Sequence, residues 1–223
     1  MLVNVTGVLD RQRLRLVQEL LARAPFVDGR LSAGAMADRV KRNEEVDVRT
    51  QEITRLNDVV MRALVAHPTY QAAAMPLRVA APYYARYRPG MTYGDHIDDP
   101  IMQADMPYRS DIAITVFLND PDDYEGGELV VRGTFGDQRV KLPAGDAVLY
   151  PASSVHQVAP VTRGERLVAV TWLQSAIRDP AKREILYGLY LAKEALRERD
   201  PEARETVQVN HAYVNLVRMW AEI

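Results

Sequence analysis

The chain has 223 residues, 48% of them hydrophobic, so it is long enough to bury a sizeable core. Its net charge of -2 gives no general electrostatic reason to expect nucleic acid or an anionic membrane as a partner. It has no cysteine, which excludes disulfides, thiolate metal sites and a cysteine nucleophile, so any metal must take nitrogen and oxygen ligands.

The N-terminal stretch MLVNVTGVLDRQRL contains a short apolar run with no basic region before it. No stretch of the chain reaches the roughly 18 consecutive apolar residues that a membrane-spanning helix needs. We therefore expect a soluble cytoplasmic protein that does not enter a membrane. A small molecule or another protein suits this composition better as a substrate than nucleic acid does.

Helical spacing is clearest in the first third of the chain. After a strand-like opening, Asp10 is a suitable N-cap for a helix that ends near residue 24. A second helix is predicted over residues 49–65, because its apolar residues recur on one face. That face is formed by Ile53, Leu56, Val59, Val60 and Leu64.

Between residues 77 and 175 the pattern changes to short runs rich in β-branched and aromatic residues. The runs are RVAAPYYARY, DIAITVFL, GELVVRG, DQRVKL, DAVLY, HQVAP and RLVAVTWL. Separators such as NDPDDYEGG and LPAGD carry the Gly, Pro, Asn and Asp that tight turns require. The spacing of the runs predicts an antiparallel sandwich or barrel rather than βαβ units.

The C-terminal part again has helical signals. Asp179-Pro180 and Asp200-Pro201 each have the form of an N-cap followed by proline at the first helical position, which predicts helices over 180–198 and 201–221. The second carries an apolar stripe, made of Val207, Tyr213, Leu216, Val217 and Trp220. The stripe can pack on the β core, or it can form a subunit interface and make the protein a homo-oligomer.

These changes of pattern predict the domain organisation. Residues 1–176 are expected to form one domain, with a helical N-terminal part over 1–76 and a β core over 77–176. Residues 177–223 are expected to form a helical C-terminal domain. The predicted fold class is mainly β with flanking helices and a helical C-terminal extension.

A candidate metal site lies in the segment YGDHIDDP. His96 and Asp98 are two residues apart, and side chains at i and i+2 of a strand point the same way. H-x-D by itself is a weak motif. His67 and His211 lie in predicted helical segments, which leaves His156, at the start of a predicted strand, as a further ligand. Two imidazoles and one carboxylate suit Fe(II) and leave coordination positions open.

Two other side chains are candidates for binding an anion near this metal. Arg166 opens the strand RLVAVTWL, where its planar guanidinium can bind a carboxylate through two hydrogen bonds. The alternative for Arg166 is a surface ion pair with Glu165 or another acid. Tyr87 is predicted to point inward together with Tyr83, and its hydroxyl can bind a ligand carboxylate or be satisfied within the core.

The motifs together resemble a known family. They are Y-x-P-G-x-x-Y-G-x-H-x-D from Tyr87 to Asp98, EGGEL from Glu125 to Leu129, and H-x9-R from His156 to Arg166. In this order they resemble the 2-oxoglutarate- and Fe(II)-dependent dioxygenases of the prolyl 4-hydroxylase type. They are most similar to the bacterial PKHD-type hydroxylases, which also have a helical C-terminal domain.

The resemblance implies a double-stranded β-helix, or jelly roll, in which His96, Asp98 and His156 hold Fe(2+). It implies that Arg166 binds the distal carboxylate of 2-oxoglutarate and that Tyr87 assists it. These residues would then form both the metal site and the co-substrate site.

The resemblance also implies the reaction, in which O2 and 2-oxoglutarate are consumed, succinate and CO2 are released, and a substrate is hydroxylated. Related halogenases have a small residue in place of the carboxylate ligand, so Asp98 favours hydroxylation. Phe117 falls where some relatives place a second co-substrate-binding tyrosine, and it lacks the hydroxyl. L-ascorbate is implied as a reductant, and the substrate is a small molecule or a peptidyl residue connected with iron uptake.

Two other classes of function are compatible with parts of the pattern. One is a cupin-like jelly roll that holds a metal for non-redox chemistry, and the other is a non-catalytic jelly-roll binding module. Arg166 favours the dioxygenase, because a non-redox site does not need a carboxylate-binding arginine ten residues after its last ligand. The loop from Asp99 to Arg109 is expected to cover the active site, with Tyr108 and Arg109 as candidate substrate contacts.

Overall fold

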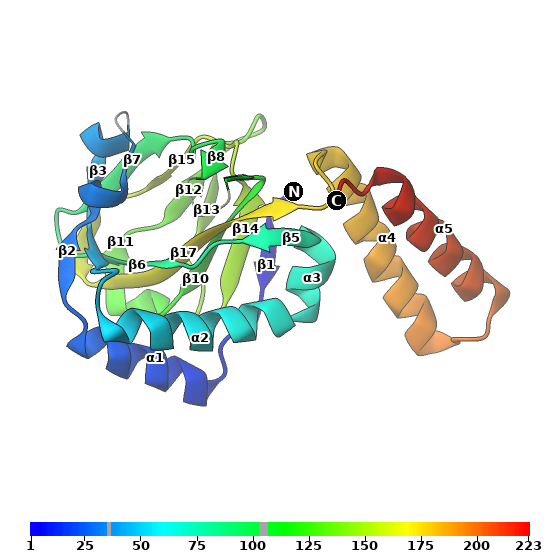
Figure 1. The fold of residues 1–223 in the computed structure, drawn as a ribbon, viewed down its shortest axis with the longest axis horizontal. Coiled ribbons are helices and arrows are strands. Elements are labelled where there is room, and N and C mark those ends of the chain that lie inside the picture. Colours follow the sequence, from blue (N-terminus) through cyan, green and yellow to red (C-terminus); the bar gives the residue numbers. More distant parts are fainter. Residues whose placement is uncertain (35–36, 103–106) are drawn as a thin grey trace.

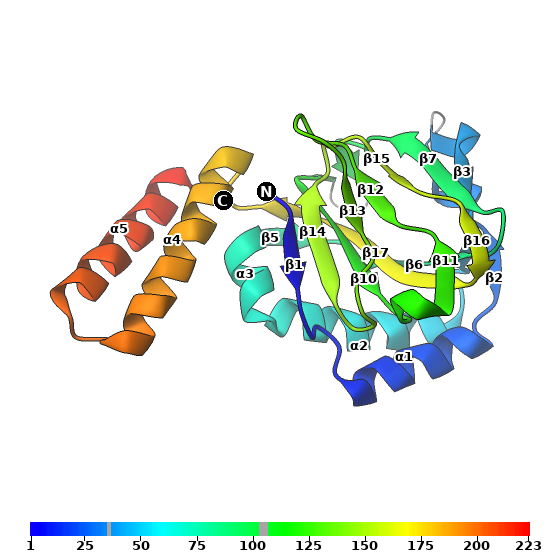
Figure 2. The same cartoon turned by 180° about the vertical axis from the view of Figure 1, so that it is seen from behind.

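The fold was analysed in a computed structural model, which describes residues 1–34, 37–102 and 107–223. Two antiparallel sheets face each other and form the β body (Figures 1 and 2). The larger sheet has the order β1 (Val3–Val5), β14 (Ala147–Pro151), β10 (Ile112–Phe117), β17 (Arg166–Ser175), β6 (Tyr83–Tyr87), β4 (Glu44–Val46) and β2 (Phe26–Asp28), and β5 (Pro76–Val79) also pairs with β17.

The smaller sheet has the order β13 (Gln138–Val140), β12 (Leu129–Val131), β15 (His156–Val158), β7 (Thr92–His96) and β3 (Lys41–Arg42). Two short ribbons complete the body, and they are β11 (Tyr124–Gly126) with β16 (Val161–Gly164) and β8 (Ile101–Met102) with β9 (Tyr108–Arg109). The predicted fold class is confirmed, since the architecture is that of a double-stranded β-helix, and the described residues include five α-helices, two of them at the C-terminus.

Each face of the larger sheet has its own core. The central strand β10 is buried at every position, because both of its faces are covered. Residues such as Phe117, Val148 and Val168 pack between the two sheets. Residues such as Ile114, Leu149 and Ala169 alternate with them and pack against the helices on the outer face. The polar groups of the cavity described below belong to the inner face.

Two of the N-terminal helices cover the outer face of the larger sheet (Figures 1 and 2). Helix α1 (Arg11–Arg23) begins at the predicted N-cap, since the Asp10 side chain accepts a hydrogen bond from the Arg13 backbone N–H. Helix α2 (Gln51–Ala66) matches the second predicted helix and buries Leu56, Val60, Ala63 and Leu64. A further helix that the sequence pattern did not predict, α3 (Pro68–Ala74), follows it directly.

The C-terminal helices form a hairpin that extends away from the β body (Figures 1 and 2). Helix α4 (Pro180–Arg199) begins after its predicted cap, Asp179. Helix α5 (Arg204–Trp220) begins three residues later than predicted, because Asp200 ends α4 and its side chain accepts hydrogen bonds from the Glu202 and Ala203 backbone N–H groups. Helix α5 packs on α4, where Tyr213 lies against Tyr190 and Trp220 against Lys182, whereas Val207 of the stripe is 41% exposed. Thr206 is the one residue of α5 that is buried.

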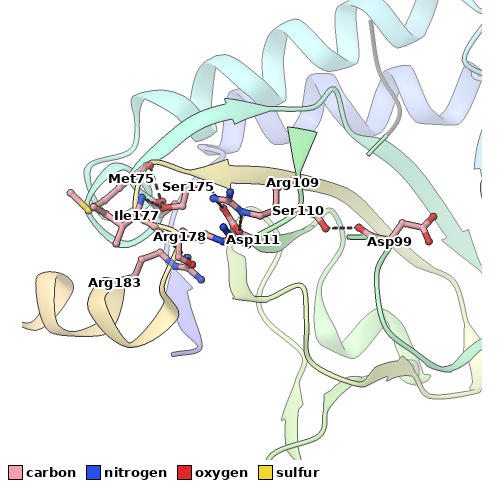
Figure 3. A network of polar contacts seen from close by, with 10 residues as sticks. Met75, Asp99, Arg109, Ser110, Asp111, Ser175, Ile177, Arg178 and Arg183 are labelled. Carbon is pink, nitrogen blue, oxygen red and sulfur yellow. Dashed lines mark hydrogen bonds and ion pairs between the residues drawn. The ribbon is translucent and has the colours of Figure 1, made fainter. Parts of the chain in front are cut away.

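A network of polar contacts connects the hairpin to the β body (Figure 3). The Asp111 carboxylate accepts hydrogen bonds from the Arg109 guanidinium and from the Ser175 backbone N–H. The Arg183 guanidinium donates to the carbonyl oxygens of Ile177 and Arg178, at the start of the helical part. The backbone between β17 and α4 is therefore held by side chains from both parts. Within the described residues, none of the helices has both the length and the apolar character needed to span a membrane.

Candidate active site

The candidate metal ligands come from two neighbouring strands of the smaller sheet. β7 and β15 pair antiparallel, and His96 lies directly opposite His156. The two histidines are therefore cross-strand neighbours on one sheet. Asp98 follows the end of β7 by two residues, so it lies just outside the strand and still on the same side.

The three side chains converge on one point. One donor atom from each of His96, Asp98 and His156 lies within 4.8 Å of the others. The Asp98 Oδ1 atom is 4.0 Å from His96 Nε2 and 3.7 Å from His156 Nε2. All three side chains are less than a tenth exposed. A single ion can therefore lie among two nitrogen donors and one oxygen donor, shielded from bulk water.

Hydrogen bonding prepares both imidazoles as ligands. His96 Nδ1 is 2.8 Å from the Gly94 carbonyl oxygen, and His156 Nδ1 is 3.0 Å from the Ser154 carbonyl oxygen. When Nδ1–H donates to a carbonyl, Nε2 carries the lone pair, which is the tautomer that a metal requires. Asp98 Oδ2 is buried without a hydrogen-bond partner among the described residues. These donors fit a divalent metal such as Fe(II), because an ion would satisfy all three.

Burial also favours the neutral form of one ligand. It lowers the pKa of His96 to about 4, and the neighbouring His156 contributes to the shift. Burial raises the pKa of Asp98, while His156 and the Trp172 side chain act in the opposite direction. An isolated carboxylate at this depth is costly, and a cation beside it removes that cost. The charge of the cluster and its geometry therefore both favour a bound cation.

Aromatic rings hold the imidazoles in place. The Tyr93 ring stacks on His96 with ring centroids 3.6 Å apart and an interplanar angle of 10°. The Tyr150 ring contacts His156 edge-on with centroids 5.0 Å apart. Each imidazole therefore has a carbonyl partner on Nδ1 and an aromatic neighbour, which restricts its orientation around the metal.

A cavity between the two sheets opens beside the three ligands. Its walls include His96, Asp98 and His156 on one side and the inward residues of β6 and β17 on the other. The predicted alternation along these strands is observed, since Tyr83, Ala85, Tyr87, Arg166, Val170 and Trp172 all line the cavity. The candidate ligands and the candidate anion-binding residues therefore share one space.

Arg166 is the most unusual side chain of this cavity, because it is only 1% exposed. Its guanidinium makes no ion pair with any carboxylate of the described residues, and its Nε atom is buried without a hydrogen-bond partner. Glu165, the surface partner that the sequence allowed for Arg166, instead contacts Arg88 at 3.1 Å. A buried cation without a partner is strongly disfavoured, so this position is suited to an anionic ligand.

Aromatic residues surround the guanidinium. Its Cζ atom lies 5.1 Å from the Tyr87 ring centroid and 5.7 Å from that of Phe117. Tyr87 is opposite Arg166 in the register of β6 and β17. Burial raises the pKa of Tyr87 to about 12, so its hydroxyl is protonated and can donate a hydrogen bond at neutral pH. Phe117 has no hydroxyl group, so its ring can only pack beside the guanidinium.

One wall of the cavity consists of residues for which the sequence predicted no role. Lys41, Asn43 and Glu45 line it, although the sequence predicted no structure between the first two helices. In KRNEEV these residues alternate with Arg42 and Glu44, which are less buried. Such an i, i+2, i+4 pattern is a strand signal. The signal was hidden because the inward residues of this strand are polar.

The remaining candidates of the sequence lie away from the cavity. His67 Nε2 contacts the Thr6 carbonyl oxygen, and His211 is exposed on α5. Arg109 pairs with Asp111, and the Tyr108 hydroxyl is 3.4 Å from the Trp172 carbonyl oxygen (Arg109 and Asp111 are shown in Figure 3). Residues 103–106 of the loop proposed as a cover lie outside the described residues.

A jelly roll with a His-Asp-His cluster at one side of an inner cavity defines the class of 2-oxoglutarate- and Fe(II)-dependent oxygenases. The model of the 2OG-Fe(II) oxygenase superfamily matches residues 82–174, which contain all of the motifs quoted above. The model of the PKHD-type hydroxylase C-terminal domain matches residues 180–222. The chain belongs to the PKHD-type hydroxylases, as its motifs predicted.

Relatives of known family cover the whole chain. A PKHD-type hydroxylase of Thioalkalivibrio sulfidiphilus is 53% identical over 224 residues, and the alignment covers 100% of both chains. The PKHD-type hydroxylase YbiX of Escherichia coli is 43% identical over 225 residues, again with 100% of both chains covered. A solved prolyl-4-hydroxylase of Pseudomonas putida has a TM-score of 0.53 at 19% identity, covering 78% of this chain and 92% of the other, and shares the fold.

The family assigns the class of reaction. The protein is an enzyme, a 2-oxoglutarate-dependent dioxygenase of the hydroxylase type. The family implies Fe(2+) as the metal and O2 and 2-oxoglutarate as co-substrates. This class is distinct from the non-redox metal enzyme and from the non-catalytic binding module that the sequence had left open.

Proposed function

We propose that the enzyme hydroxylates a small-molecule or peptidyl substrate while 2-oxoglutarate and O2 are converted into succinate and CO2. One observation carries the proposal more than any other. The buried guanidinium of Arg166, which has no carboxylate partner among the described residues, lines the same cavity as the three candidate metal ligands. A molecule that chelates a metal at one end and carries a carboxylate at the other satisfies both sites at once.

In this proposal His96, Asp98 and His156 hold the iron. The bound iron supplies the redox chemistry of oxygen activation. The protein contributes two neutral imidazoles and one carboxylate, so the site keeps a net positive charge that attracts an anionic chelating group. The carbonyl partners of both Nδ1 atoms keep the Nε2 lone pairs directed at the metal position.

Arg166 and Tyr87 bind the distal carboxylate of 2-oxoglutarate. The guanidinium offers two parallel N–H groups, and the Tyr87 hydroxyl offers a third donor. The apolar side chains of Val168 and Val170 follow Arg166 on the inward face of β17. They limit the access of water to the space between the two polar ends, which strengthens both interactions.

Other features of the proposal rest on the resemblance or on sequence properties alone. They are L-ascorbate as a reductant, a cytoplasmic location, and a substrate connected with iron uptake. The homo-oligomer is proposed to form through the C-terminal helices, because the α4–α5 hairpin extends from the β body and carries exposed apolar side chains such as Ile185, Leu191 and Met219. Light scattering of the purified protein tests the oligomer.

The domain boundaries of the sequence analysis are also part of the proposal. Residues 1–176 would form the dioxygenase domain, with its helical part over 1–76 and its jelly roll over 77–176. Residues 177–223 would form the helical C-terminal domain. The boundary is supported by the end of β17 at Ser175 and by the separate packing of α4 on α5. Hydrogen exchange followed by mass spectrometry tests it, and residues 177–223 are expected to open as a cooperative unit separate from residues 1–176.

The decisive experiment is anaerobic reconstitution of the protein with Fe(II) and 2-oxoglutarate. We expect a weak visible metal-to-ligand charge-transfer band, which requires that 2-oxoglutarate chelates iron in the protein. Addition of O2 should then yield succinate in step with the loss of 2-oxoglutarate. A folded protein that binds Fe(II) and shows no band would contradict the proposed function.

A further inference from the structure

Residues 41–45 connect the two sheets at the edge of the cavity. Lys41 belongs to β3 of the smaller sheet, where it pairs with Tyr93, and Glu45 belongs to β4 of the larger sheet, where it pairs with Ala85. Lys41, Asn43 and Glu45 are about 5% exposed each, and all three line the cavity. This connection forms a polar wall beside the inward residues of β6.

The two charged residues of this wall satisfy each other. Lys41 Nζ is 2.6 Å from Glu45 Oε1 and donates to Ser32 Oγ at 2.7 Å, and Ser32 Oγ in turn donates to Glu45 Oε2 at 2.6 Å. These contacts compensate both charges without a ligand. Lys41, Ser32 and Glu45 therefore hold the backbone between residues 41 and 45 in place. Asn43 lies in the centre of this segment.

Asn43 has no such compensation. Its side chain is buried, and both Nδ2 and Oδ1 lack a hydrogen-bond partner among the described residues. A buried amide without partners costs about 1–3 kcal/mol per unsatisfied group. Its backbone is held, because its carbonyl oxygen accepts a hydrogen bond from the Gly29 N–H. A Cβ atom on Gly29 would lie 1.9 Å from Asn43 Oδ1, so this glycine leaves room for the amide.

The register of the larger sheet places Asn43 beside the anion-binding residues. Tyr87 is opposite Arg166 between β6 and β17. Glu44 is opposite Arg86 between β4 and β6, which brings the preceding Asn43 to the level of Tyr87. Burial raises the pKa of Tyr87, whereas Arg166 and, to a smaller extent, the neighbouring Asn43 side chain lower it. Asn43, Tyr87 and Arg166 therefore form one row on the inner face.

We propose that the Asn43 amide donates a hydrogen bond to the distal carboxylate of 2-oxoglutarate, beside Arg166 and Tyr87. This inference rests on the proposed function. A carboxylate accepts about four hydrogen bonds, of which the guanidinium takes two and the Tyr87 hydroxyl one. The remaining acceptor position and the unsatisfied amide N–H group complement each other. Phe117, on the other side of Arg166, has no donor to offer.

The role makes Asn43 a specificity-determining residue for the co-substrate. Binding of a dicarboxylate would satisfy the amide N–H group, whereas a 2-oxo acid that ends in a methyl group would leave this group unpaired. A site built to hydrogen-bond a group discriminates strongly against an analogue that lacks the group, because its own polar atoms then stay unpaired. The enzyme should therefore distinguish 2-oxoglutarate from 2-oxopentanoate, which has the same carbon chain and the same chelating end.

The test measures both ligands on the iron-loaded protein. Dissociation constants of 2-oxoglutarate and of 2-oxopentanoate are obtained anaerobically from the charge-transfer band, for the unaltered protein and for Asn43→Ala. We expect 2-oxoglutarate to bind roughly tenfold to hundredfold more weakly to Asn43→Ala, the range for a hydrogen bond to a charged group, and 2-oxopentanoate to bind equally well to both. Asn43→Asp, which is isosteric, should weaken 2-oxoglutarate further by charge repulsion and remains informative if Asn43→Ala does not fold.

A matched control is Asn57→Ala in α2. This asparagine also has a side-chain oxygen that is buried and unpartnered, but it does not line the cavity, so both dissociation constants should stay unchanged. Unchanged binding of 2-oxoglutarate to Asn43→Ala, or equal weakening of both ligands, would overturn the inference while the proposed function stands. Absence of the band in the unaltered protein would overturn both.

Discussion

At the scale of single residues, one feature distinguishes Arg166 from the other arginines of the chain. Arginines such as Arg86 and Arg109 contact a carboxylate, and the buried Arg183 donates to two backbone carbonyl oxygens. Arg166 is buried with neither kind of partner among the described residues. The protein tolerates a buried and uncompensated charge only where something else supplies the counter-charge. Stability is thus reduced locally in favour of binding, as expected at a functional site.

We predict that Arg166→Ala retains iron and binds 2-oxoglutarate roughly a hundredfold more weakly, because two charge-assisted hydrogen bonds are lost. Arg166→Lys should recover only part of the affinity, since an ammonium lacks the planar pair of donors. Both values come from anaerobic titration of the charge-transfer band. Normal affinity of Arg166→Ala for 2-oxoglutarate would show that the carboxylate binds elsewhere.

The metal ligands behave differently in the proposed arrangement. We predict that Asp98→Ala and His156→Ala lose most of the bound iron, because two donors do not complete the site. Metal analysis after anaerobic loading and desalting measures the iron content. His67→Ala is the control, since this histidine contacts the Thr6 carbonyl oxygen and should not affect iron. Equal loss of iron in Arg166→Ala would contradict the division of roles.

The Lys41–Glu45 pair leads to a prediction about stability. Lys41→Met leaves the buried Glu45 carboxylate without its cation, so we expect a loss of about 3–5 kcal/mol in the free energy of unfolding. The double variant Lys41→Met/Glu45→Leu removes both charges and should be clearly more stable than Lys41→Met. Urea denaturation followed by circular dichroism gives both values. A double variant as unstable as the single one would contradict this explanation.

At the scale of elements, the glycine-rich turns are as the sequence predicted. Gly126 ends β11 with φ of +70°, and a Cβ atom there would lie 2.1 Å from the Pro160 carbonyl oxygen. Gly90 also has a positive φ, +85°, but no heavy atom lies within 4 Å of the corresponding Cβ position. Substitution of Gly90 would therefore cause backbone strain alone, whereas substitution of Gly126 would cause both backbone strain and a steric clash.

We predict that Gly90→Ala costs about 1–2 kcal/mol of stability, the usual penalty for a left-handed alanine. Gly126→Ala should cost clearly more, because the backbone of Pro160 must move as well. Thermal unfolding of both variants measures the difference. Similar melting temperatures would show that the turn at Gly126 relaxes freely.

The strands that the sequence analysis missed have a physical explanation. β2, β3 and β4 are two or three residues long, and the inward positions of β3 and β4 carry Lys41 and Glu45. A strand is recognised from alternating apolar residues, and here the buried residues are charged because they face a polar cavity. The start of the last helix was predicted at residue 201, which is too early. Asp200 resembles an N-cap in the sequence, but in the structure its side chain stabilises a turn before the helix begins.

At the scale of the whole molecule, the β body and the C-terminal hairpin differ in burial. Strand β10 is buried at every position, whereas α5 buries Thr206 alone. We predict that in the monomer the backbone amides of α5 exchange with deuterium much faster than those of β10, because fewer buried contacts oppose local opening. Hydrogen exchange with mass spectrometry measures this, and α2 is the control helix. Equal protection of α5 and α2 would indicate that the hairpin is covered in solution, which the proposed oligomer explains.

The sequence by itself determined an antiparallel sandwich or barrel and the metal-ligand candidates, because ligand spacing, turn glycines and strand alternation are local properties. The resemblance of its ordered motifs to a known family added the jelly roll. The sequence identified Arg166 as a candidate without establishing whether its charge is paired. Only the tertiary structure decided that the guanidinium makes no ion pair within the described part of the chain and that His96 lies opposite His156. It also placed Asn43 beside Tyr87. These are relations between strands far apart in the chain, and pairing register and burial exist only once the sheets have formed.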